Sequence, residues 1–264
     1  MTRRMSPAIA TCVILSFLSL SAAGDEATIR GGSSNAQKAL TRAADAAKAR
    51  QSQEAVDWAT KAIETGAADP IAFYLRGRER LRLGEFQKSV ADFDRYRILR
   101  PAVASRLWER GIACYYAKQF QAGADQFRAY QTYHGNDVEN AVWHVVCLAP
   151  SIGFEQAQSK MLPIEFDARI PMMDIYRLFR GEGKPEDVMR AARRGNPTPQ
   201  QLNDRLMYAN LYLGLYHESK GELDQSRKYL ETAAQKHRND NYMWDVARVH
   251  AKSRRKSDAS NSQP

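Results

Sequence analysis

Residues 70–101 read PIAFYLRGRERLRLGEFQKSVADFDRYRILRP, and residues 104–135 read ASRLWERGIACYYAKQFQAGADQFRAYQTYHG. The second stretch repeats the first at an offset of 34 residues, and four pairs are identical: Gly77 and Gly111, Phe86 and Phe120, Phe93 and Phe127, Tyr96 and Tyr130. This period is typical of a helix–turn–helix unit that cannot bury its apolar face alone and stacks on copies of itself. The repeat therefore predicts an all-α protein that binds partners rather than performing chemistry.

Each unit has a simple physical design. Gly77 lies on the first helix and lets the second helix approach closely, because it has no side chain to hold the two apart. Gly84 ends the first helix, and Phe86 and Phe93 fill the space between this helix pair and the next. Pro101 then stops the second helix.

The pattern continues, less regularly, on both sides. The Ala-rich segment 36–65 favours helix. Near the other end, residues 212–214 and 221–223 reproduce the spacings of the clear units, after a capping box formed by Thr198 and Gln201 with Pro199 in the first turn. We expect six segments: a signal peptide (1–23), a flexible lead-in (24–35), N-terminal repeats (36–135), degenerate helical repeats (136–197), a C-terminal repeat with a final helix (198–252) and a disordered tail (253–264).

This order of small, glycine and aromatic positions resembles the tetratricopeptide repeat, which implies an α-solenoid. From Asp137 to Lys252 the chain further resembles the new lipoprotein I family of periplasmic adaptor lipoproteins, through residues 210–216, 221–226 and the turn at Ala233 and Ala234. That resemblance implies a non-catalytic adaptor of the cell envelope that holds proteases and cell-wall enzymes together. The lipidated cysteine of that family has no counterpart here.

The first residues are typical of a secretory signal. Arg3 and Arg4 precede a largely apolar stretch at 8–20, and small residues follow at 21–23. We therefore expect export to the periplasm or the outside of the cell. The alternative is an uncleaved signal that anchors the chain in the inner membrane.

Composition sets broad limits on the partner. Of 264 residues, 44% are hydrophobic and 26% charged, as in ordinary soluble proteins. The net charge is +9 from 39 Lys and Arg against 30 Asp and Glu, and removal of Arg3 and Arg4 leaves +7. The excess of positive charge fits a protein or peptide partner and favours an acidic one. We expect contact with a membrane to be at most peripheral. No dense basic cluster indicates nucleic acid.

The first helices of stacked pairs line a groove, so seven side chains are candidate contacts. Arginine beside tyrosine or tryptophan is common in binding hot spots, and we expect an extended peptide or protein C-terminus with acidic groups to bind there. Alternatively, Arg78 and Arg82 form a solvated face paired with Glu79 or Glu85, and the tyrosines pack on a neighbouring helix. The candidate groove residues are Tyr74, Arg78, Arg82, Trp108, Ile112, Tyr115 and Tyr116.

The sequence contains little that points to an enzyme. Its five histidines lack metal-ligand spacing, and no phosphate loop or nucleophile elbow is present, so we expect no catalytic site, metal or cofactor. His217 and Glu218 could form an acid–base pair, but side chains of this kind on a helix more often face solvent. Cys114 and Cys147 could form a disulfide in an oxidising compartment, and separate buried thiols are the favoured alternative.

The function predicted from the sequence is an exported adaptor or scaffold that binds proteins or peptides in its groove. The main alternative is a structural envelope factor that assembles into a homo-oligomer, and an unrecognised hydrolase that uses His217 and Glu218 is a third.

Overall fold

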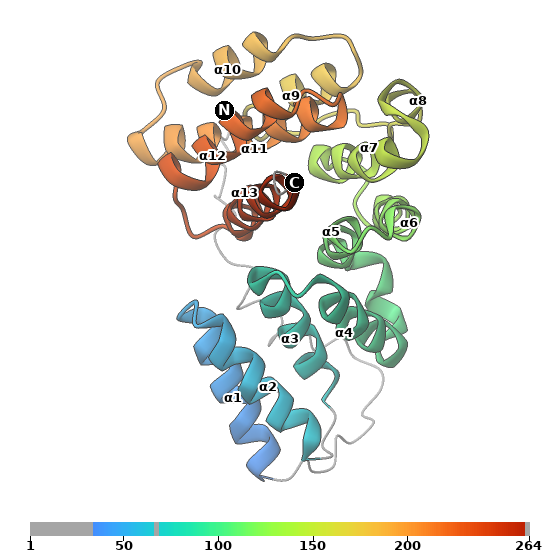
Figure 1. Cartoon of the computed structure of the whole chain (residues 1–264), viewed down its shortest axis with the longest axis vertical. Helices are drawn as coiled ribbons and strands as arrows, with labels where there is room; N and C mark the ends of the chain where they lie inside the picture. Colours follow the sequence, from blue (N-terminus) through green and yellow to red (C-terminus); the bar gives the residue numbers. More distant parts are fainter. Residues whose placement is uncertain (1–33, 66–68, 262–264) are drawn as a thin grey trace, which may run out of the picture. The chain divides into compact units, whose positions relative to one another are not determined.

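A computed structural model describes residues 34–65 and 69–261, with side chains described up to Arg254. The described part of the chain is helical without strands, as the sequence predicts (Figure 1). The predicted signal peptide and nearly all of the predicted lead-in lie outside the described residues.

The N-terminal repeats form three helix pairs, each packed on the next. The two units quoted above form α3/α4 and α5/α6, and the Ala-rich segment forms α1/α2, so the repeat prediction is confirmed here. A short 3-10 helix, η1, joins the second pair to the third. The bounds are α1 Ser34–Lys48, α2 Ser52–Glu64, α3 Pro70–Leu83, α4 Phe86–Leu99, η1 Pro101–Arg106, α5 Trp108–Tyr116 and α6 Phe120–Gln131.

The glycines allow the close helix contact that the sequence predicts. A Cβ atom added to Gly111 would lie 2.6 Å from the ring of Phe127, and one added to Gly214 would lie 2.5 Å from Leu230 Cγ. These distances are shorter than any normal carbon contact, so the second helix could not sit where it does if either position carried a side chain. Both crossings follow one design, although they lie in different repeats.

The turn inside each pair contains a residue in the left-handed conformation. Gly84 has a φ of 84°, and Arg50 and Lys118, at the 34-residue offset on either side, have φ values of 61° and 60°. A residue with a Cβ atom is strained there by about 1 kcal/mol or more. The first pair, α1/α2, lacks aromatic residues at the positions of the repeat, but its left-handed turn at Arg50 still falls at the 34-residue period.

The less regular middle segment also consists of helices, and α11 and α12 form a further pair. The capping box predicted at Thr198 is present: its hydroxyl accepts a hydrogen bond from Gln201 N at 3.3 Å, and Gln201 Oε1 accepts one from Thr198 N at 2.9 Å. Trp143 of α7 is 1% exposed and lies in the largest apolar core. The bounds are α7 Val138–Ile152, α8 Phe154–Ser159, α9 Met172–Phe179, α10 Pro185–Arg193, α11 Pro199–Ser219 and α12 Leu223–Lys236.

The last helix, α13 (Tyr242–Asn261), packs against α12, α11 and α3 (Figure 1). It continues to Asn261, past residue 253, where the sequence predicts a disordered tail to begin. One reason is that Arg254 is held by an ion pair to Glu218, which polar composition alone does not reveal.

Two further features bear on the predictions. Cys114 and Cys147 are buried free thiols, and a Cβ added to Gly123 would meet Cys147 Sγ at 2.8 Å and Cys114 Cβ at 3.4 Å. Burial raises the pKa of both thiols.

Within residues 34–65 and 69–261, no helix has the length and apolar character needed to cross a bilayer.

Candidate partner-binding surface

Helices α3 and α5 present the seven candidate groove residues. Tyr74, Arg78 and Arg82 lie on α3, and the other four lie on α5. We call the surface formed by six of these residues, all but Ile112, the α3/α5 face. Ile112 is fully buried and belongs to the core beneath this face, and Tyr115 is 7% exposed.

Carboxylates from the same helices hold the arginines of the face. Glu109 is buried, accepts a hydrogen bond from the Tyr74 hydroxyl at 2.7 Å, and lies 3.7 Å from Arg78 Nε. Burial raises the pKa of Glu109, against the opposing charge of Arg78 and the Tyr74 hydrogen bond. Arg82 Nη1 lies 2.5 Å from a carboxylate oxygen of Glu79, one of the two pairings that the alternative interpretation names.

Helix α13 covers the face with an aromatic side chain. The ring of Tyr242 contacts two arginines, with the guanidinium carbons of Arg78 and Arg82 at 4.3 Å and 5.0 Å from its centre. Its hydroxyl donates a hydrogen bond to the Arg78 carbonyl at 3.2 Å, and Trp108 meets the ring edge-on at 5.5 Å. Cation–π contacts of this kind strengthen when water is excluded.

The same helix supplies an acidic group to the face. Asp245 has a side chain that is 2% exposed, and its carboxylate accepts from Arg82 Nε at 2.9 Å and from Arg50 Nη2 at 2.5 Å. Arg50 comes from the strained turn between α1 and α2. The sequence leads us to expect an acidic group of a partner beside these arginines. In the structure the carboxylate of Asp245, from the chain's own α13, lies beside Arg82.

A second polar cluster holds α13 against the end of α5. His250 is fully buried, with Nδ1 at 2.9 Å from the Tyr116 hydroxyl and Nε2 at 2.6 Å from Glu218. Glu218 also accepts hydrogen bonds from Tyr115 and Arg254. Burial alone would raise the pKa of Glu218, but the charges and hydrogen bonds of His250 and then Arg254 outweigh it and hold the pKa well below its ordinary value.

The sequence analysis therefore misses part of the surface. Arg50, Glu218 and three residues of α13 (Tyr242, Asp245, His250) complete the contacts of the face. One signal is present in the sequence: besides Tyr242, four of the six residues 242–247 are apolar. In the structure all six are buried. A helix that is apolar on more than one side packs against more than one neighbour.

The pair His217 and Glu218 does not act as a unit. His217 Nδ1 lies 2.5 Å from Glu222, and its ring stacks on Tyr229 at 5.4 Å, whereas Glu218 faces α13. Both side chains are largely buried, which differs from the solvent-facing alternative. Across the described residues, no group of three or more His, Cys, Asp or Glu side chains has a metal-binding arrangement.

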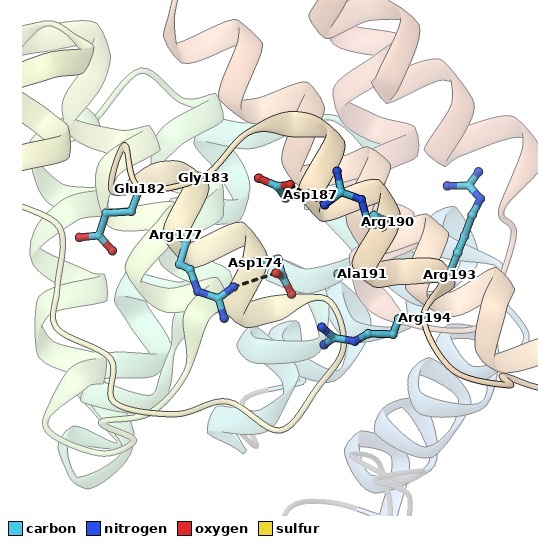
Figure 2. Close-up of a pocket in the computed structure, with 9 residues that line it drawn as sticks. All are labelled: Asp174, Arg177, Glu182, Gly183, Asp187, Arg190, Ala191, Arg193 and Arg194. Atoms are coloured by element: carbon cyan, nitrogen blue, oxygen red, sulfur yellow. Dashed lines mark hydrogen bonds and ion pairs between the residues drawn. The ribbon is translucent and has the colours of Figure 1, made fainter.

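A separate basic pocket lies between α9 and α10 (Figure 2). It has a volume of about 640 Å³. Arg177 and Arg190 are paired with Asp174 and Asp187 at 2.8 and 2.9 Å. The pocket is lined by Asp174, Arg177, Glu182, Gly183, Asp187, Arg190, Ala191, Arg193 and Arg194.

Among the described residues, no carboxylate pairs with Arg193 or Arg194 of this pocket. Arg193 donates only to the Met189 carbonyl, at 3.1 Å, and no hydrogen bond or ion pair engages the Arg194 guanidinium in the described part of the chain. Burial lowers the pKa of nearby His237, and the charge of Arg193 and then of Lys236 lowers it further. Arg193 and Arg194 therefore give the C-terminal end of α10 a local positive charge.

Comparison with known proteins supports the fold. No protein-family profile matches the chain, and no curated protein does. A crystal structure of a tetratricopeptide repeat protein from Parabacteroides merdae is similar, with a TM-score of 0.50 and 14% sequence identity, over 83% of each chain. That likeness shows the fold. It confirms the predicted class, an all-α stack of tetratricopeptide-type helix pairs, and at this identity it carries no partner across.

Proposed function

We propose that this protein is an exported adaptor that binds a segment of another protein on its α3/α5 face. One observation carries the proposal: six of the seven candidate residues, all but the core residue Ile112, gather on one surface that already holds a helix. Aromatic rings, arginines and a buried carboxylate acceptor make this surface able to recognise both an apolar and an acidic group. Folds of this kind commonly mediate protein–protein interaction.

Other features support the location and the role. The charged start and apolar stretch of the first 23 residues favour export. The resemblance to the new lipoprotein I family favours an adaptor that brings envelope proteases or cell-wall enzymes together. A binding role of this kind needs no metal, cofactor or catalytic group.

The experiment is affinity capture from envelope extract with the full chain, followed by measurement of binding with the purified partner. Arg78 and Arg82 lie beside Glu109 and Glu79, so changing them to glutamate would crowd four carboxylates together and damage the fold. The double variant Arg78→Gln, Arg82→Gln is the milder test. The matched control is Arg128→Gln, which changes an exposed arginine on α6 whose partner is Asp125 at 2.9 Å.

We expect the double variant to lose at least about tenfold in affinity, because charge-assisted contacts each contribute about 1.5 to 3 kcal/mol. The control should bind like the unchanged protein. Equal affinity of all three proteins would overturn the proposal.

A further inference from the structure

Charged and hydrogen-bonding side chains make the contacts between α13 and the α3/α5 face. Within one repeat the two helices meet through a small residue and an apolar ring, as at Gly111 and Phe127, and neighbouring repeats add polar contacts such as Tyr74 with Glu109 and Arg110 with Asp94. Helix α13 meets the face through a tyrosine that contacts two arginines, a buried aspartate and a buried histidine. These polar contacts specify what the face accepts, because a wrong occupant leaves a charge buried and unpaired.

The contacting residues follow a helical pattern. Tyr242, Asp245 and His250 lie at positions i, i+3 and i+8, which is one side of a helix. Tyr242 and Asp245 meet α3, and His250 meets α5. The pattern is short enough to occur on a single helix of another protein.

Neighbouring repeats of the stack contact each other directly as well as through α13. Helices α2 and α3, α4 and α5, and α6 and α7 contact each other directly. Helix α13 reaches α3 from a distant part of the sequence, after the connecting residues 237–241. Its release would expose the α3/α5 face while the repeat-to-repeat contacts remain.

The fit of α13 on the face is also incomplete. Arg78 Nε is buried and has no hydrogen-bond acceptor, and its nearest carboxylate oxygen, on Glu109, is 3.7 Å away. An unsatisfied buried donor is unfavourable by about 1 to 3 kcal/mol. A different helix that brings an acceptor to this nitrogen would bind the face better than α13 does.

Resting on the adaptor function proposed above, we propose that α13 occupies the site of a partner helix and is displaced by it. The partner segment is an amphipathic helix with an aromatic residue and a carboxylate three positions later, and with a hydrogen-bond acceptor that reaches Arg78. In the free protein α13 covers the face, so the face becomes available only to a helix of this chemistry.

The test uses a fluorescent peptide of residues 239–261 and three forms of the full chain. In the Asp245→Arg chain, a new positive charge faces Arg50 and Arg82 and repels α13 from the face. The matched control is Asp240→Arg, which makes the same charge change at a side chain that is 99% exposed. A second peptide carries the Asp245→Arg change.

We expect the unchanged peptide to bind the Asp245→Arg chain at least about tenfold more tightly than the unchanged chain or the Asp240→Arg chain, since its charge-assisted contacts become available in trans. The peptide with Asp245→Arg should bind at least about tenfold more weakly to the same host. Equal peptide binding by all three chains, or none by a folded Asp245→Arg chain, would overturn the proposal.

Hydrogen exchange on the unchanged protein gives a second measurement that does not depend on any variant. Amides of α13 should exchange through local opening, faster than those of α11 and α12. If α13 exchanges only with global unfolding, it is a permanent part of the fold and the proposal fails.

The two proposals fail in different ways. A captured partner that depends on Arg78 and Arg82 but is not displaced by the peptide leaves the adaptor function standing and refutes competition with α13. A partner that binds the Arg78→Gln, Arg82→Gln variant as tightly as the unchanged protein refutes the adaptor site itself. This holds whether or not the peptide displaces that partner.

Discussion

Replacing Asp245 with asparagine should strongly destabilise the protein, since its carboxylate joins three separate parts of the chain. Its oxygens accept hydrogen bonds from Arg50 and Arg82 at 2.5 and 2.9 Å, and its side chain is 2% exposed. Asparagine has nearly the same shape, so the change removes the charge while leaving the packing intact.

The expected magnitude follows from these contacts. Two charge-assisted hydrogen bonds contribute about 1.5 to 3 kcal/mol each. The loss should fall short of their sum, because Arg82 keeps Glu79 at 2.5 Å and Arg50, with 26% of its side chain exposed, can turn toward water. We expect the free energy of unfolding to drop by about 2 to 4 kcal/mol.

Urea unfolding of the full chain at pH 7, followed by circular dichroism, measures this change. Asp240→Asn is the matched control, because Asp240 is 99% exposed and 3.8 Å from the same Arg50, and its unfolding midpoint should not move. A loss of less than about 1 kcal/mol for Asp245→Asn, as for an exposed ion pair, would refute the view that this carboxylate fastens α13.

Three further predictions follow from single residues. Gly111→Ala should lower the free energy of unfolding by about 1 to 3 kcal/mol, because the new methyl group overlaps the Phe127 ring, and a thermal melt with unchanged midpoint would contradict this. Glu218 has a lowered pKa in the folded protein, so its stabilising effect is complete above the ordinary value of 4.5 and declines as the pH falls toward the folded pKa. The free energy of unfolding of Glu218→Gln should therefore approach that of the unchanged protein in acid. A difference between the two proteins that stays constant across pH would contradict this. Arg193→Gln should raise the pKa of His237 toward its ordinary value, measured by NMR titration of the ring protons, and an unchanged or lower pKa would show that the charge of Arg193 does not reach that ring.

The sequence predicts the parts of this fold that depend on local chemistry. The close helix crossing at Gly111, the helix end at Gly84 and the capping box at Thr198 each involve residues within one repeat, so short-range spacing reveals them. The turn at Arg50 is harder to foresee, because arginine does not favour a positive φ and only the 34-residue register places it there.

The cover over the α3/α5 face could not be predicted in the same way. Asp245 and Arg82 are separated by 163 residues, and a single acid and a single base so far apart carry no pattern in one sequence. The sequence does predict a final helix and an acidic preference of the face. The sequence does not show that the last helix lies close to α3, so it cannot identify Asp245 as the acidic group on the face.

The two buried thiols have a practical consequence for following motion in this protein. Cys114 of α5 and Cys147 of α7 both lie against Gly123 of α6, and burial raises their pKa, so alkylating reagents reach a reactive thiolate only when these helices separate. The rate of alkylation at these two positions thus records how often the layer beneath the α3/α5 face opens. Because peptide mapping resolves the two sites, the unmodified protein carries its own pair of kinetic probes.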